Sequence, residues 1–168
     1  GDSSRYNLYD TLATTDDLEC LFDILSSVKD VNGNPCVFTA VSVVANPDFK
    51  KIRETDFQEY HYEPFTETLK RYPGCDNSFK LWQEGIQQHL FVPQFHGREH
   101  LNILAWLKAL QANHTHTRIA FDQGMWGFVT SSEDNIGVSF QAAFDLKDPS
   151  ELLYQETVIK EGLQLFKI

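Results

Sequence analysis

Basic residues are scarce in this sequence, and long apolar runs are absent from it. The 14 Lys and Arg residues stand against 24 Asp and Glu, so the formal net charge is −10 at pH 7. That charge repels nucleic-acid phosphates and anionic membrane surfaces, which argues against both as partners. A membrane-spanning helix needs roughly 18 or more consecutive apolar residues. No run approaches that length, so we expect no membrane insertion.

Cysteine is also rare, and its placement carries little chemistry. Cys20, Cys36 and Cys75 lie far apart, and no two of them form a Cys-x-x-Cys pair. This spacing argues against a disulfide framework. Cys20 falls on a helical pattern and Cys36 opens an apolar stretch, so we expect both to be small buried side chains. The sequence does not decide between the cytoplasm and the cell envelope.

The length and the ends of the chain bear on its domain organisation. At 168 residues, one domain is expected, with enough chain to bury a sizeable core. The sequence begins with Gly1 rather than Met, and it stops at Ile168 while a helical pattern is still running. We therefore expect residues 1–168 to be a single domain that is a fragment of something longer.

Apolar residues recur at helical spacing in several segments. One stripe near the start consists of Leu18, Leu21, Phe22, Leu25 and Val28. Asp16 is expected to cap this helix, with Glu19 three residues later completing a capping box. Further helices are expected over residues 64–71, 77–88 and 98–112, and from residue 149 onward.

Strands are expected between these helices. Residues 36–44 are nearly all apolar or β-branched, which favours a strand covered on both faces. Residues 89–92 form a short apolar run, and residues 119–121 and 138–144 are weaker strand candidates. The alternation of helices and strands predicts an α/β fold with largely parallel strands.

The most informative segment places His96 and His100 four residues apart, where the run 89–92 leads into the helix expected from residue 98. Residues at i and i+4 share a helical face, so both imidazoles could reach one metal ion. Imidazole is the commonest metal-ligating side chain. The alternative is a pair of surface or capping histidines.

The motif His96-Gly-Arg-Glu-His100 resembles the histidine motif of polysaccharide deacetylases, the chitooligosaccharide-deacetylase homology domain. Residues 62–72 and 93–102 are similar to a divergent bacterial branch of that family. The resemblance spans roughly residues 14–168, and its motifs are specific only around residues 91–101. It implies a fragment of a catalytic domain with a (β/α) barrel fold.

The resemblance also implies a site and a reaction. In that family a His-x-x-x-His pair and one Asp bind a divalent metal, usually zinc, and a neighbouring Asp is the general base that removes an acetyl group from a sugar amine. Carried over to this chain, His96, His100 and Asp17 are the expected zinc ligands and Asp16 is the expected catalytic base. The implied partner is a carbohydrate substrate, and the oligomeric state is left open.

Two features depart from the family pattern. Asp16-Asp17 is the only Asp-Asp pair, but Leu18 begins a helix at once, and a helix N-terminus attracts carboxylates for electrostatic reasons. No Arg-Pro-Pro-like or Leu-x-x-His segment occurs after residue 117. The alternative function is therefore a catalytically inactive domain of the same fold that binds carbohydrate or acts as a scaffold.

His96-x-x-Glu99-His100 also matches the inverted zinc-peptidase motif, but Pro93 and Gly97 disfavour the helix at His96 that this motif needs.

Two further segments allow a functional and a structural interpretation. His114 and His116 are expected in a polar loop, either joining a metal site or simply solvated. The loop over residues 122–127 either presents Trp126 to a sugar or packs it into the core.

Overall fold

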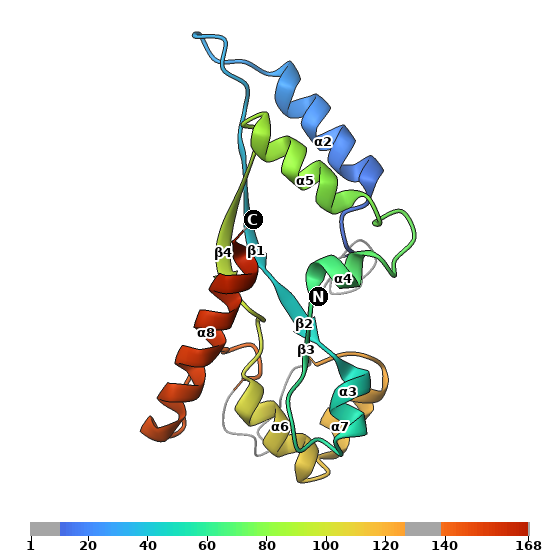
Figure 1. Cartoon of the computed structure of the whole chain (residues 1–168), viewed down its shortest axis with the longest axis vertical. Coiled ribbons are helices and arrows are strands. Elements are labelled where there is room, and N and C mark those ends of the chain that lie inside the picture. The colour runs from blue at the N-terminus through green and yellow to red at the C-terminus, as the bar shows by residue number, and fades with distance from the viewer. Residues whose placement is uncertain (1–10, 127–138, 168) are drawn as a thin grey trace, which may run out of the picture. The chain divides into compact units, whose positions relative to one another are not determined.

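The computed structural model describes residues 11–126 and 139–167 (Figure 1). The described chain separates into two compact units. The first is built from the chain up to Val41 together with Thr66–Gln94, and the second from Ser42–Phe65 together with the chain from Phe95 onward.

The core of the first unit lies between α2 (Thr15–Ser27) and α5 (Ser78–Gln87), which pack against each other (Figure 1). Its buried cluster consists of Leu18, Phe22, Leu90 and Phe91. Gly85 allows the close approach of the two helices, because a Cβ at this position would lie 2.5 Å from Cζ of Phe22. The helices predicted in this part of the chain are confirmed.

The cap of α2 differs from the predicted one. Thr14 is the N-cap residue, and its hydroxyl accepts a hydrogen bond from the Asp17 backbone N–H at 3.2 Å. The Asp17 carboxylate in turn accepts the Thr14 backbone N–H at 2.9 Å. The predicted capping box of Asp16 with Glu19 is therefore wrong by two residues. The Thr14–Asp17 pair supplies acceptors for free backbone N–H groups at the helix start, as a capping box does, but about half a turn earlier than predicted.

Strands pair in two separate two-stranded sheets within the described residues. β1 (Phe38–Val43) pairs with β4 (Phe91–Gly97). Phe38 donates to the Leu90 carbonyl and Val44 to the Gly97 carbonyl, so both chains advance in the same direction and the strands are parallel. β2 (Ala45–Pro47) pairs antiparallel with β3 (Tyr62–Pro64). The fold is mixed α/β, with parallel strands alternating with helices.

Residues 36–41 are more exposed than their composition predicted. Val37 is 53% exposed and Val41 is 66% exposed. Ala40 packs against the core of the first unit, while Val37 and Val41 have the opposite parity along the strand and face away. The prediction of a strand covered on both faces is thus wrong for this part of β1. Cys20 and Cys36 are also exposed, which corrects the prediction that both are buried.

The second unit contains the larger apolar core. It is formed around α3 (Phe49–Glu54), α6 (Ile103–Gln111), α7 (Thr115–Asp122) and α8 (Leu152–Phe166), the last preceded by a 3₁₀ turn over Pro149–Glu151. Its largest fully buried side chains include Ile52, Trp106, Leu110, Phe121 and Phe140, each at most 2% exposed. The short α4 (Phe65–Leu69) begins where the chain leaves this unit. The helix predicted from residue 149 is confirmed.

Three predictions in the second unit need correction. The helix expected over residues 98–112 begins only at Ile103, because Asn102 caps it by accepting the Ala105 N–H at 3.1 Å. Residues 119–121, expected as a strand, belong to α7, whose buried positions include Thr117, Ala120 and Phe121 at helical spacing. Residues 139–144 lie in turns and a loop rather than a strand, and residue 138 lies outside the described residues.

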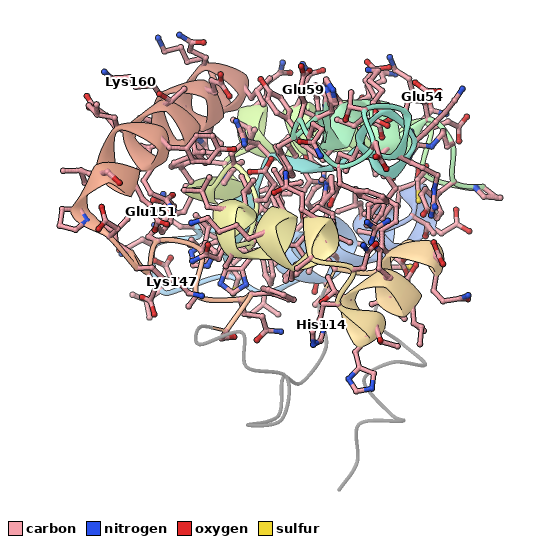
Figure 2. All side chains as sticks on the ribbon, turned by 90° about the horizontal axis from the view of Figure 1, so that it is seen from below. Glu54, Glu59, His114, Lys147, Glu151 and Lys160 are labelled. Carbon is pink, nitrogen blue, oxygen red and sulfur yellow. The ribbon has the colours of Figure 1, made fainter. Side chains whose placement is uncertain are left out.

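His114 and His116 do not occupy the polar loop predicted for them. His114 lies at the start of α7 (Figure 2), where its Nδ1 accepts the Thr117 N–H at 3.3 Å, and His116 lies in the first turn of that helix. Within residues 11–126 and 139–167, no helix combines the length and the apolar character needed to cross a membrane.

Candidate functional site

His96 and His100 lie side by side at the end of β4. The centroids of their rings are 5.2 Å apart, with 33° between the ring planes. Both side chains are exposed. His96 belongs to the strand and His100 to the bend that leads to α6, so the shared helical face predicted for them is wrong. A turn of the chain, rather than a helical turn, brings the rings together.

Gly97 makes this turn possible. Its φ of +155° is a value that residues with a Cβ rarely adopt, and an added Cβ would lie 3.2 Å from the Glu99 carbonyl oxygen. His96 lies at the carboxyl end of β4, which is paired in parallel with β1. Binding sites of parallel sheets gather at this end.

The two imidazoles have the chemistry of a partial metal site. Zinc binds imidazole nitrogens at about 2 Å, and two rings on one side of a turn can share an ion. In the part of the chain that the structure describes, however, no group of three or more His, Cys, Asp or Glu side chains is gathered as a metal site needs. The structure brings together two of the expected ligands.

Asp16 and Asp17 lie in the first turn of α2, and thus in the first unit, whereas both histidines lie in the second unit. Oδ2 of Asp17 accepts hydrogen bonds from the Thr14 hydroxyl at 2.7 Å and from the Thr14 backbone N–H at 2.9 Å. These bonds lower the pKa of the Asp17 carboxyl, the hydroxyl contributing most. Asp17 therefore serves the helix cap, as the electrostatic alternative proposed.

The residues between the histidines form a buried charged cluster that motif analysis missed. Arg98 is 3% exposed and Glu99 is 4% exposed. Nε of Arg98 donates to both Glu99 carboxylate oxygens, at 2.8 and 2.9 Å, and Nη1 pairs with Glu161 of α8. The Tyr60 hydroxyl donates to Oε1 of Glu99 at 2.9 Å. The Arg98 guanidinium lies 4.3 Å from the centroid of the Tyr62 ring.

Burial controls the protonation of this cluster. It raises the pKa of Glu99, and the adjacent Arg98 charge opposes that rise. The pKa of Tyr60 is raised well above its ordinary value, by burial first and by the Glu99 charge second, so its hydroxyl remains a donor. Tyr60 and Tyr62 come from one segment and Glu161 from another, and both segments lie far from Arg98 in the sequence, so no local spacing indicated them. The only local signal was an Arg-Glu pair flanked by two histidines.

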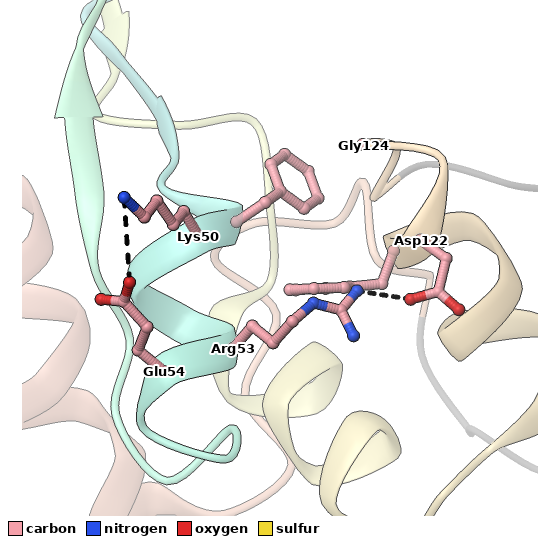
Figure 3. A pocket seen from close by; sticks show the side chains of 7 residues that line it. Lys50, Arg53, Glu54, Asp122 and Gly124 are labelled. Carbon is pink, nitrogen blue, oxygen red and sulfur yellow. Dashed lines mark hydrogen bonds and ion pairs between the residues drawn. The ribbon is translucent and has the colours of Figure 1, made fainter.

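A cleft of about 500 Å³ lies elsewhere in the second unit, between α3 and the end of α7 (Figure 3). It is lined by Phe49, Lys50, Arg53, Glu54, Phe121, Asp122 and Gly124. Its charged side chains are engaged with each other: Arg53 pairs with Asp122, and Lys50 lies 4.0 Å from Glu54.

Trp126 packs against the core cluster, which is the structural alternative to a sugar-stacking role. Gly127 lies outside the described residues.

Comparisons with known protein families, with curated proteins and with solved structures found no match for this chain. The resemblance to polysaccharide deacetylases therefore rests on the residues quoted for it.

Proposed function

We propose that this chain carries the metal-binding histidines of a hydrolase similar to polysaccharide deacetylases, which removes acetyl groups from a carbohydrate. The observation that carries the proposal is the juxtaposition of His96 and His100, exposed and 5.2 Å apart between ring centroids, at the carboxyl end of a parallel strand. The finer fold that goes with this proposal is part of a deacetylase-type (β/α) barrel.

The proposed roles follow from the chemistry of the side chains. His96 and His100 would hold a divalent ion, and imidazole nitrogen suits zinc. Bound there, zinc would polarise the acetyl carbonyl and activate water. Asp17 is proposed as the third ligand and Asp16 as the base that takes a proton from water.

Metal analysis tests the site directly. The protein is incubated with zinc, dialysed and measured for bound metal, alongside a His96→Ala/His100→Ala variant. A matched control is His114→Asn/His116→Ala, because that pair has ring centroids 5.9 Å apart and Asn can keep the cap of α7. We expect near-stoichiometric zinc in the native protein and the control, and none in the first variant. No retained zinc in the native protein would sink the metal-site proposal.

A second candidate function is a catalytically inactive domain that binds carbohydrate or acts as a scaffold. The engagement of Asp17 in the cap of α2 favours it, because the proposed third ligand already has a structural role. Zinc-loaded protein incubated with acetylated oligosaccharides distinguishes the two. Acetate release that disappears in the His96→Ala/His100→Ala variant supports the hydrolase. Oligosaccharide binding without acetate release supports the inactive domain.

A further inference from the structure

The two exposed histidines flank three buried residues, Gly97, Arg98 and Glu99. If this turn had no supporting contacts, the distance between the two rings would vary, because exposed side chains sample several rotamers. Here the backbone between the two histidines is hydrogen-bonded to the first residue of β2 and to the residue before it. The Arg98 carbonyl accepts two hydrogen bonds, from the Val44 N–H at 3.1 Å and from the Ala45 N–H at 2.8 Å.

Side-chain contacts also fix the position of Arg98. We use the name Arg98 cluster for Tyr60, Tyr62, Arg98, Glu99 and Glu161. Within it, one guanidinium joins two carboxylates and lies over a Tyr ring, while Tyr60 supplies a further donor to Glu99. The fork of an Arg side chain fixes the direction of each bond, so the cluster defines the position of Arg98 rather than only its charge.

Helix α8 closes on the turn as well. Gly162 lies against it so tightly that a Cβ there would be 3.0 Å from Cβ of Arg98 and 3.1 Å from its backbone N. The same atom would be 2.8 Å from Cζ of Phe95. Glu161, the neighbour of this glycine, is thereby placed where it reaches Nη1 of Arg98.

We propose that the Arg98 cluster positions His96 and His100, with Arg98 as the positioning residue and Glu161, Glu99 and Tyr60 as its anchors. In the proposed site the cluster would contact neither the ion nor the substrate, and it acts by holding the turn from which both rings project. Its importance for metal binding rests on the proposed function, whereas the juxtaposition of the rings can be measured without any metal. Buried polar partners of this kind govern how well ligands converge on an ion.

Metal-free NMR tests the positioning itself. The nuclear Overhauser cross-peak between the His96 and His100 rings reports their separation, and the His114–His116 cross-peak is an internal reference in the same sample. In Glu161→Gln and in Tyr60→Phe we expect the first cross-peak to weaken at least about twofold and the second to stay unchanged, because a site loses its geometry when its supporting shell is loosened. Unchanged ring cross-peaks in both folded variants would overturn the proposal.

Glu156→Gln is the matched control on the same helix. It also replaces one carboxylate by an amide, but Glu156 is exposed and pairs with Lys160. We expect it to leave the His96–His100 cross-peak unchanged. Arg98→Lys is the stricter variant, since Lys keeps the charge without the fork. If it fails to fold, the two milder variants decide the outcome.

Zinc titration then tests the link to the proposed function. Loss of a group that hydrogen-bonds a metal ligand weakens affinity by about 10- to 100-fold. Glu161 acts one step further out, through Arg98, so we expect a loss of up to about 10-fold for Glu161→Gln and none for Glu156→Gln. Equal affinities in these two variants would overturn the link, even if the ring pair is loosened. If the native protein binds no zinc, the proposed function fails, and the NMR result alone decides the positioning.

Discussion

At the scale of single residues, burial distinguishes two ion pairs that each join an Arg to a carboxylate. The side chains of Arg98 and Glu99 are 4% and 2% exposed, whereas those of Arg53 and Asp122 are 54% and 57% exposed. Removing one partner of a buried pair leaves an uncompensated charge in the core, while water solvates the survivor of an exposed pair. The two pairs should therefore respond very differently to the loss of a carboxylate.

We expect Glu99→Gln to lower the free energy of unfolding by at most about 3–5 kcal/mol, the usual loss when a buried charge is left unpaired, because Arg98 keeps its ion pair with Glu161. Asp122→Asn should lower it by less than about 1 kcal/mol, because its pair is exposed and screened. Urea denaturation at constant pH measures both values. Similar losses in the two variants would contradict the view that Arg98 depends on Glu99.

The Thr14–Asp17 cap predicts a pH dependence. The folded-state pKa of Asp17 is lowered below its ordinary value of 3.8, mainly by the Thr14 hydroxyl and then by the Thr14 N–H. A lowered carboxyl pKa stabilises the fold above the unfolded pKa, and this contribution is lost as the pH falls through the folded pKa. We therefore expect the stability difference between the native protein and Asp17→Asn to shrink as the pH is lowered from 6 to below 3.8.

Thermal melts across that range provide the measurement. Asp16→Asn is the control, because Asp16 lies in the same turn of α2 but its side chain is not the one that completes the capping box. A pH-independent difference for Asp17→Asn would show that the carboxylate contributes nothing to the cap.

At the scale of elements, one glycine sets the distance between α2 and α5. In Gly85→Ala, helix propensity favours the folded state by about 1 kcal/mol. The new methyl group would meet the Phe22 ring at 2.5 Å, and overpacking of this kind costs about 1–3 kcal/mol. We expect net destabilisation, measured by chemical denaturation. Phe22→Leu should relieve the contact, so that Gly85→Ala becomes neutral or stabilising in that background.

The first residue of α6 is set by contacts with residues that are distant in the sequence. The apolar pattern predicted a helix from residue 98, and helical spacing is indeed present there. Asn102 begins the helix later, and its amide nitrogen also donates to the carbonyls of Ala142 and Asp145, at 3.0 and 2.9 Å. These partners lie about 40 residues away, so the spacing of apolar residues could not indicate them.

The prediction of a strand at residues 119–121 is wrong for a related reason. Ile119, Ala120 and Phe121 are compatible with a strand when they are taken alone. In the fold, Ala120 and Phe121 join the buried face of α7, and His114 caps that helix. Neighbours on both sides decided the element, because three residues contain too little periodicity to distinguish the two structures.

At the scale of the whole molecule, a ligand that binds only the folded chain stabilises it by mass action. Under the proposed function, free zinc at 100 times its Kd should stabilise the fold by about 2.7 kcal/mol. We expect the melting temperature to rise with zinc in the native protein and in His114→Asn/His116→Ala. It should not rise in His96→Ala/His100→Ala. An equal rise in all three proteins would point to binding elsewhere.

The single domain over residues 1–168 and the barrel of which it would form part stay predictions. Within the described residues, the strands form one parallel and one antiparallel pair. The carbohydrate substrate and the roles of Asp16 and Asp17 as base and ligand are likewise proposals, to be decided by the metal and acetate measurements.

The sequence by itself determined the α/β class, the positions of α2, α5 and α8, and the spacing of His96 and His100. Periodicity and motif spacing are local properties, so they can be read along the chain. Only the tertiary structure decided that the histidines meet across a glycine turn, and that Arg98 and Glu99 are buried there and bonded to Tyr60 and Glu161. The physical reason is that this cluster joins separate segments, whose side chains meet only when the chain folds.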